Sequence, residues 1–485
     1  MRITLKDNKR NYSMPWKMAV GDSDGSVPLC SKDVRERLLH FDGVPLKKLR
    51  NQENGGGNFL VFPFDAGERD VDDDDSLFSL TEKDSDTPGF YTGNLMGFVG
   101  LGSGIQLQIT SRFDSGKNNY FLHYMLQKGC NVALAPKTGS DEDQFYDFLY
   151  YLFPSYLHNA LAQGMYHTYI TREYNDANVR GPIDIARHIR NNIPFNGKIA
   201  YHTSEYSTDN HVTQLVRHTI EFIRSLRMGD AVLNGGVSSS TRDDVRAIVG
   251  ATSTYSRSCR LKVIEKNLRP ITHPYYTAYE PLRKLCLAIL HNQKLSYGDI
   301  SNDVISGIIF DGASLWEEYL GTLMSPDIIH SNNRSKKDGI SLFEKSNVHY
   351  YPDFYRVGDR SKTGTEPNGL VLDAKYKDLL KKEESEDFSD GKTSVSIGRD
   401  DLFQMMAYMY ALPVNRAYLL IPKENKDNKL PDCVIKSKPK IVKGNVGEIG
   451  AIAFPIPSNA KTFEEFSERM AKVENSFKTE PFISQ

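Results

Sequence analysis

The chain has 485 residues, of which 39% are hydrophobic, so it is long enough for about two to four domains with buried cores. Its formal net charge of −2 excludes a uniformly basic nucleic-acid-binding protein, so any DNA-binding surface has to be local. The five cysteines are scattered without a Cys-x-x-Cys pair, which argues against a zinc or iron–sulfur site. With neither a signal sequence nor an apolar stretch of membrane-spanning length, we expect a cytoplasmic protein that makes no contact with a membrane.

Residues 1–170 are predicted to contain many short strands. Two apolar runs at 94–101 and 104–110 flank a Gly-Ser-Gly turn, and the second run alternates apolar and polar residues, which is typical of a β-hairpin. Helices are predicted over 120–126 and 145–152. We interpret the acidic run from Asp70 to Asp75 as a solvated loop rather than a cation site or a phosphate mimic.

Residues 171–300 are predicted to be helical. Asp209 is expected to cap a helix whose apolar residues recur at a spacing of three and four between 212 and 226, and a second helix is expected over 281–290. The apolar stripe of the second helix is interpreted as core packing rather than as a cofactor site.

Residues 301–485 alternate between predicted helices and buried strands. The expected order is a helix over 313–320, strands at 348–357 and 369–377, a helix over 400–411 and a strand over 416–422. A final helix is expected to start at Thr462, which opens a Thr-x-x-Glu capping box. The predicted fold class is therefore α+β and multidomain, with a β-rich N-terminal region (1–170), a helical middle region (171–300) and a C-terminal α/β core (301–485).

Asp353 and Asp373 are each expected at the end of a buried strand. Asp353 follows Pro352, and Asp373 begins an Asp-Ala-Lys sequence that ends at Lys375. Side chains two residues apart on a strand share a face, so Lys375 lies on the same side as Asp373. Two carboxylates and a lysine at the ends of adjacent strands suffice to position one metal ion and one attacking water for phosphodiester hydrolysis. The alternative is a Pro-Asp turn and an unrelated surface ion pair.

The predicted metal is Mg²⁺, for which Mn²⁺ can substitute, because Mg²⁺ prefers hard oxygen ligands and retains several waters. Its expected ligands are the carboxylates of Asp353, Asp373 and Glu317 and the backbone carbonyl of Ala374. Glu317 is on the predicted helix over 313–320 and can reach the metal from there. Glu318 has the same composition and is the alternative, since only one of two adjacent helical residues can face the metal.

Gln404 and Tyr408 are four residues apart and lie on one face of the predicted helix over 400–411. They are expected to orient Lys375 or to contact the DNA backbone. For Tyr408 the alternative is core packing, because the nearby Tyr410 has no assigned role.

The succession of a Glu-bearing helix, Pro-Asp, Asp-x-Lys and Gln-x-x-x-Tyr resembles the PD-(D/E)xK nuclease superfamily in its RecB-like branch. The fuller resemblance, over about residues 170–425, is to the McrC family, the nuclease subunit of McrBC-type modification-dependent restriction systems. It is carried by 315–317, 371–377 and 402–408, and further upstream by 180–184 and 206–210. Trp316 stands where phenylalanine is common in the family, and Thr213 stands where asparagine is expected.

The resemblance implies a Mg²⁺-dependent endodeoxyribonuclease that cuts modified double-stranded DNA together with a separate McrB-like AAA+ GTPase ring, a hexamer whose hydrolysis it stimulates. The chain itself lacks a phosphate-binding loop: its single Gly-Lys-Thr, at 391–393, is preceded five residues earlier by Glu386 instead of glycine. Two alternatives remain open from the sequence. One is a non-catalytic activator of an AAA+ NTPase, and the other is a stand-alone RecB-like repair nuclease.

The resemblance also implies that the N-terminal region enters the pore of the GTPase ring. The predicted hairpin around Gly102–Gly104 and the glycine-rich loop at Asn54–Gly57 are expected to form a projecting β element for this purpose. On this basis, residues 171–485 should fold without the first 170. The alternative role for 1–170 is a DNA-binding domain, which would need a basic face that the mixed charge does not provide.

Overall fold

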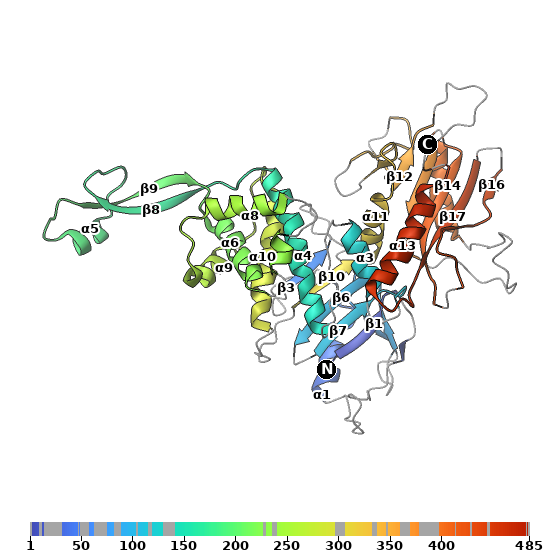
Figure 1. Ribbon diagram of the computed structural model, residues 1–485, viewed down its shortest axis with the longest axis horizontal. Helices are drawn as coiled ribbons and strands as arrows, with labels where there is room; N and C mark the ends of the chain where they lie inside the picture. Colours follow the sequence, from blue (N-terminus) through green and yellow to red (C-terminus); the bar gives the residue numbers. More distant parts are fainter. Residues whose placement is uncertain are drawn as a thin grey trace. The chain divides into compact units, whose positions relative to one another are not determined.

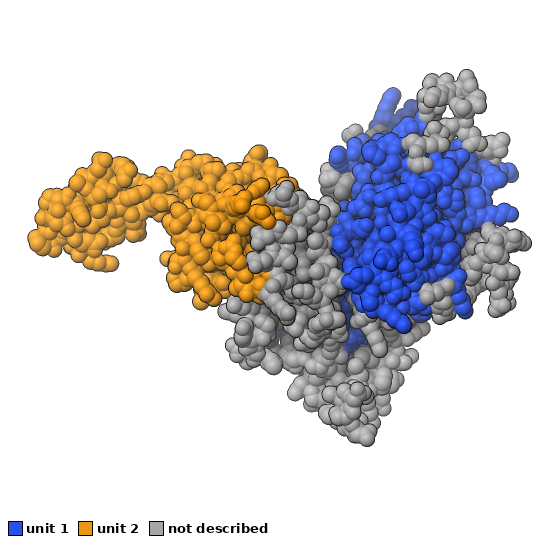
Figure 2. Space-filling model, in the orientation of Figure 1, with its two compact units in different colours: residues 1–136, 299–485 blue, residues 137–298 orange. Residues whose placement is uncertain are grey.

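The computed structural model describes residues 2–8, 12–13, 32–46, 48, 58–62, 75–81, 89–102, 105–114, 119–129, 141–226, 229–234, 240–295, 306–331, 337–345, 348–358, 369–377, 397–412, 414–426, 429–443, 447–481 and 483. The chain forms two compact units, shown in different colours in Figure 2. Unit 1 combines residues 1–136 with residues 299–485, and unit 2 consists of residues 137–298. Most of the predicted turn at 102–104, the loop at 54–57 and residues 70–74 of the acidic run lie outside the described residues.

Unit 1 contains a five-stranded sheet built from both ends of the chain. Its strand order is β1-β7-β6-β10-β3. Its elements and those next to it are β1 (Arg2–Lys6), β2 (Tyr12–Ser13), α1 (Lys32–Phe41), β3 (Asn58–Phe62), β4 (Ser79–Thr81), β5 (Gly89–Tyr91), β6 (Leu95–Gly102), β7 (Ile105–Thr110), α3 (Tyr120–Gly129) and β10 (Ser306–Asp311). Strand β10 pairs with β3 in parallel and with β6 antiparallel, so a strand from the third predicted region completes the sheet of the first.

This pairing changes two expectations. The hairpin predicted at 94–110 is confirmed as the antiparallel pair β6–β7, but it lies inside the sheet, flanked by β1 and β10, and does not project. The boundaries of the units fall near 136 and 298 instead of at 170 and 300, because β10 pairs with N-terminal strands and the helix α4 (Asp141–Ala162) packs in unit 2. A fragment of residues 171–485 would leave both edges of β10 without partners, so we no longer expect it to fold alone.

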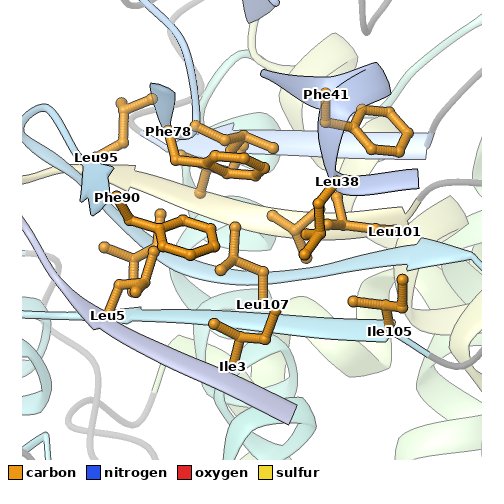
Figure 3. Packing of buried hydrophobic residues seen from close by; sticks show 14 of the residues in the cluster. Ile3, Leu5, Leu38, Phe41, Phe78, Phe90, Leu95, Leu101, Ile105 and Leu107 are labelled. Atoms are coloured by element: carbon orange, nitrogen blue, oxygen red, sulfur yellow. The ribbon is translucent and has the colours of Figure 1, made fainter. Parts of the chain in front are cut away.

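One face of the five-stranded sheet is covered by the core of the N-terminal region. Figure 3 shows how Ile3, Leu5, Leu107 and other strand residues meet Leu38 and Phe41 of α1 and Phe78 and Phe90 next to them. Their burial stabilises the sheet by about 25 cal/mol per Å² of apolar surface removed from water.

The second half of unit 1 is a seven-stranded sheet with helices packed on it. The strand order is β11-β12-β13-β14-β17-β15, and β16 pairs with β17. Strands β13, β14 and β17 are parallel, whereas β11 and β12 are antiparallel to their neighbours. The elements are α11 (Gly312–Gly321), β11 (Ile329–His330), β12 (Phe354–Arg356), β13 (Leu370–Ala374), α12 (Arg399–Ala411), β14 (Arg416–Glu424), β15 (Ile435–Lys436), β16 (Lys440–Val442), β17 (Gly447–Ile456) and α13 (Phe463–Lys478).

A buried glutamate joins three helices of unit 1. Glu474 of α13 accepts hydrogen bonds from the hydroxyls of Tyr124 in α3 (2.6 Å) and Tyr319 in α11 (3.0 Å). A buried carboxylate is tolerated only when its oxygens have donors; here both phenols donate to Oε1, and the ammonium of Lys128 lies 3.4 Å from Oε2. Thr462 caps α13 as predicted by accepting from the backbone of Glu465, but the Glu465 carboxylate bonds Lys461 instead of closing the capping box.

Unit 2 is a helical body that carries a long β-hairpin. Its elements are α4 (Asp141–Ala162), β8 (Thr168–Asp176), α5 (Ile185–Asn192), β9 (Ile199–Ser207), α6 (His211–Arg224), α7 (Gly229–Asn234), α8 (Ser240–Ala251), the 3₁₀ turn η2 (Arg257–Cys259), α9 (Arg260–Lys266) and α10 (Tyr279–Leu295). The predicted helices over 212–226 and 281–290 are confirmed as α6 and α10. Asn210, and not Asp209, caps α6, and Thr213 completes its capping box through the Asn210 backbone N–H.

The hairpin is the feature of unit 2 that a helical prediction missed. Strands β8 and β9 pair over nine residues each, and Figure 1 shows them leading away from the helices of their unit to α5 at the far end. We call residues 168–207 the arm. One face of β8 is half-buried and the other is exposed, but the half-buried face carries Thr168, Arg172 and Asp176, so the alternation of burial is not matched by an alternation of apolar and polar residues that would identify the strand from sequence.

Glycine and arginine residues hold the arm together near α5. A Cβ at Gly181 would lie 2.1 Å from the backbone oxygen of His202, so only glycine allows the chain to cross β9 there. Asp184 caps α5, and the guanidinium of Arg187 bonds the backbone oxygen of Tyr174 on β8. These contacts therefore fix α5 against the two strands of the arm.

Candidate functional site

The two aspartates face each other at the end of a strand pair. In the antiparallel register of β12 and β13, Phe354 is opposite Leu372, which places the preceding residue Asp353 opposite Asp373. The Asp353 carboxylate accepts a hydrogen bond of 2.6 Å from the backbone N–H of Ala374. The N–H and C=O of a strand residue point toward the same neighbouring strand, so the Ala374 carbonyl lies on the side of Asp353 as well.

Burial and mutual repulsion raise the pKa values of both carboxyl groups. The pKa of Asp353 is held well above its usual range, first by burial and then by the charges of Asp373 and Glu317. The pKa of Asp373 is raised mainly by burial, although Lys375 opposes the shift. Like-charged groups held together out of water are unfavourable unless a cation compensates them. The site therefore favours the binding of positive charge.

Lys375 is held in a short polar chain. Its Nζ lies 2.8 Å from Oδ2 of Asp373 and donates a 3.1 Å hydrogen bond to Oε1 of Gln404. The amide of Gln404 donates in turn to the hydroxyl of Tyr408 at 3.0 Å. Burial works to lower the pKa of Lys375, but the charges of Asp373, Asp353 and Asp401 outweigh it, so the pKa is raised and the lysine stays protonated. The predicted Gln404–Tyr408 face of α12 does meet Lys375.

Helix α11 brings Glu317 close to the same carboxylates. Asp311 caps the helix through the backbone N–H groups of Ala313 and Ser314, and Trp316 anchors it by donating from Nε1 to the backbone oxygen of Leu420 on β14 (3.1 Å). The charge of Glu317 contributes to the raised pKa values of both Asp353 and Asp373. Its neighbour Glu318 also lies on α11 and acts on His330.

His330 is a residue of this site that the sequence did not indicate. Its Nε2 lies 3.1 Å from Oε1 of Glu317, and its ring packs on Phe354 with the ring centroids 4.6 Å apart. Burial lowers its pKa, but the hydrogen bond and charge of Glu317 outweigh this, so the pKa is raised. A lone histidine on a two-residue strand has no sequence pattern, and only the pairing of β11 with β12 brings it here.

Two further residues of the site were not predicted. Asp401 forms an ion pair with Lys377 at 3.3 Å and lies 3.9 Å from Nζ of Lys375. Tyr376 bonds Ser111 through its hydroxyl at 2.7 Å, and the guanidinium of Arg112 lies over its ring. Tyr376 therefore ties the end of β13 to the N-terminal sheet.

The donor atoms of the site fit a hard divalent cation. Oδ2 of Asp373 is buried and has no aligned hydrogen bond, since its contact with Lys375 is an ion pair of poor hydrogen-bond geometry. Within the described ranges, no three His, Cys, Asp or Glu side chains are gathered as a complete metal cluster. Mg²⁺ does not require one, because it binds through one or two carboxylates and keeps several waters.

Comparison with known protein families identifies one family that this chain matches. The model of the McrBC 5-methylcytosine restriction system component family matches residues 91–422, which is more than half of the chain and includes Asp353, Asp373 and Lys375. A search of curated proteins found no match. Of the described helices, none has the length and apolarity needed to span a membrane.

Two solved structures are similar at low identity. A chain in the refined half-complex from a tetradecameric assembly of Thermococcus gammatolerans McrB AAA+ hexamers with bound McrC is 14% identical, with a TM-score of 0.46, and the match covers 99% of each chain. A chain in the cryo-EM structure of the T. gammatolerans McrBC complex is 14% identical, with a TM-score of 0.30, and the match covers 67% of this chain and 87% of that one. From the family match, this chain belongs to the McrBC 5-methylcytosine restriction system component family.

Proposed function

We propose that this chain is the DNA-cleaving subunit of a McrBC-type restriction complex, with a PD-(D/E)xK core that hydrolyses phosphodiester bonds of modified double-stranded DNA. The observation that carries the proposal is the pair of opposed carboxylates, Asp353 and Asp373, with the Lys375 ammonium next to Asp373. A non-catalytic activator gains nothing from this arrangement, because the mutual repulsion of buried carboxylates destabilises the fold.

In the proposed reaction, Asp353, Asp373, Glu317 and the Ala374 carbonyl would hold Mg²⁺, or Mn²⁺ in its place. The ion supplies charge stabilisation for the phosphoryl group and lowers the pKa of the attacking water. Lys375 stays protonated and is positioned to orient the water and to stabilise charge that develops on the phosphoryl oxygens. Gln404 holds the Lys375 ammonium, and Tyr408 holds Gln404. His330 fixes Glu317.

We further propose that the chain works with an AAA+ GTPase ring and stimulates its hydrolysis. Membership of the McrBC family supports this, as does the absence of a Gly-x-x-x-x-Gly-Lys-Ser/Thr loop from the sequence. The element we assign to the ring is the arm, in place of the hairpin β6–β7, which is enclosed by its own sheet.

The end of the arm carries the chemistry of a docking element. Ile185 and Ile189 of α5 are 69% and 54% exposed, and Phe195 is 68% exposed. Exposed apolar clusters of this kind are rare on surfaces that face only water and mark interaction sites. A stand-alone repair nuclease has no use for such an element.

The complex itself provides the test of the proposed function. Affinity isolation of the full-length chain from its host should recover an AAA+ protein. The recovered complex should make double-strand cuts in 5-methylcytosine-containing DNA only when both Mg²⁺ and GTP are present. Cutting that persists in EDTA, or a recovered complex that never cuts with both present, would contradict the proposal.

Glu317 should matter more for cleavage than Glu318. We expect Glu317→Gln to reduce the cleavage rate by about 10²-fold, as for the loss of one charge-stabilising group, and Glu318→Gln to have a much smaller effect. The physical reason is that the charge of Glu317 acts on both Asp353 and Asp373. Single-turnover cleavage by the two variants decides the point, and a larger loss from Glu318→Gln would show that the other glutamate faces the metal.

A further inference from the structure

Unit 2 carries a local concentration of positive charge that the proposed catalytic site does not use. Residues 254–273 contain five basic residues and one acidic residue, in a chain whose net charge is −2. This segment includes η2, α9 and the turn that follows them. Four of its basic residues, Arg257, Lys262, Lys266 and Arg269, are exposed. We call these four residues the basic strip.

The basic strip is not explained by folding. Val263 and Ile264 are buried and attach α9 to its unit, which leaves Lys262 and Lys266 on the exposed side, one helical turn apart. Like charges at this spacing destabilise a helix. Among the described residues, no carboxylate forms an ion pair with any of the four, whereas other exposed cations of unit 2, such as Arg224 and Arg246, are paired with acidic residues.

Positive charge in this region also acts on two neighbouring histidines. The pKa of His211 is lowered by burial and by the charge of Lys266. The pKa of His218, on the same helix α6, is lowered to about 4 by burial and by Arg260 and Arg217. Arg260 stands next to the strip, with its guanidinium over the ring of Phe222. The region around α9 is therefore electropositive and attracts anions.

We propose that the basic strip binds the phosphate backbone of duplex DNA, as a DNA-contacting surface separate from the catalytic site. Exposed lysine and arginine side chains without acidic partners are the groups that neutralise phosphates and release counterions. Nothing on the strip is arranged to read bases, so binding should not depend on sequence or methylation. The proposal shares with the proposed function only the assumption that duplex DNA is the ligand.

The test is a binding measurement on the full-length chain without divalent metal, so that it does not depend on cleavage. A fluorescent duplex of about 30 base pairs is titrated at several KCl concentrations. The variant R257Q/K262Q/K266Q/R269Q should bind at least about 10-fold more weakly at low salt, and the slope of log K against log salt should become shallower by about 0.9 for each phosphate that the variant no longer neutralises.

A matched variant controls for the change in net charge. R224Q/R246Q/K426Q/K436Q removes four exposed cations that are already paired with acidic residues, and it should leave affinity and slope nearly unchanged. If both variants lost DNA affinity equally, the effect would depend only on net charge, and the proposal would be overturned. It would also be overturned if the strip variant kept wild-type DNA binding and lost affinity for the AAA+ partner, since the strip would then be a protein interface. If the complex does not cleave DNA while the strip variant still binds DNA more weakly than the wild type, only the proposed function is overturned.

Discussion

Asp373→Asn should abolish detectable double-strand cleavage, with a loss of at least about 10²–10³-fold, while the chain still stimulates the GTPase of its partner. Asp373 is buried at the end of β13, opposite Asp353 and 2.8 Å from the ammonium of Lys375. Removing its charge removes both a proposed metal ligand and the carboxylate that contributes most to raising the pKa of Lys375. The measurement is cleavage of methylated plasmid by the reconstituted complex, with GTP hydrolysis followed in parallel.

Controls separate this effect from a general loss of charge or of stability. Asp243→Asn removes an exposed carboxylate of unit 2 that pairs with Arg246, and it should cleave at the wild-type rate. Lys375→Gln should be as inactive as Asp373→Asn, whereas Lys377→Gln, which changes a half-exposed side chain paired with Asp401, should lose much less. Full-rate cutting by Asp373→Asn would refute the site assignment.

Deleting the arm should abolish stimulation of the GTPase without unfolding unit 2. Thr168 and Ser207 are register partners at the base of the arm, so a short glycine-rich loop can join them in place of residues 169–206. The helical core, including Leu215, Ile220 and Leu285, lies outside the deleted segment. Circular dichroism should show retained helix, and the GTPase rate of the partner should fall to its value without this subunit.

A milder variant tests the proposed interaction itself. Ile189→Asp together with Phe195→Asp places charge on the exposed apolar end of the arm and should weaken partner binding by at least about 10-fold, as expected for buried interface anchors. Phe343→Asp with Ile441→Asp makes the same chemical change at two exposed apolar residues of unit 1 and serves as the control. If stimulation of the GTPase survives deletion of the arm, another part of the chain must be responsible for it.

The N-terminal region also has a structural role in the half of unit 1 that carries the proposed catalytic groups. Tyr376, one residue after Lys375, bonds Ser111, and its ring lies beneath the guanidinium of Arg112. Gly312, at the start of α11, approaches so closely that a Cβ there would lie 2.8 Å from the ring of Tyr376 and 3.0 Å from the backbone oxygen of Asn94. The N-terminal strands therefore help to position the strand and the helix that carry the proposed catalytic groups.

The sequence alone determined the elements whose signals are local. The apolar run ending in Asp373 predicted β13, whereas Asp353 precedes β12 and does not end a strand. The four-residue spacing of Gln404 and Tyr408 predicted a shared helical face, the apolar stripe predicted α6, and Thr462 with the stripe after it predicted α13. Because Asp373 and Lys375 are two residues apart on a strand, their proximity also followed from strand geometry. These inferences need no long-range information. The catalytic roles of the residues they concern stay predictions.

Only the tertiary structure decided which distant segments meet. Strand β10 joins an N-terminal sheet more than 200 residues away, and the short strand β11 delivers His330 to Glu317 by pairing with β12. The arm was missed because the half-buried face of β8 carries polar residues such as Thr168 and Arg172, so no hydrophobic periodicity identifies the strand. Pairing between remote strands and the projection of an exposed hairpin depend on the packing of the whole unit, and a local pattern of residue types carries no record of either.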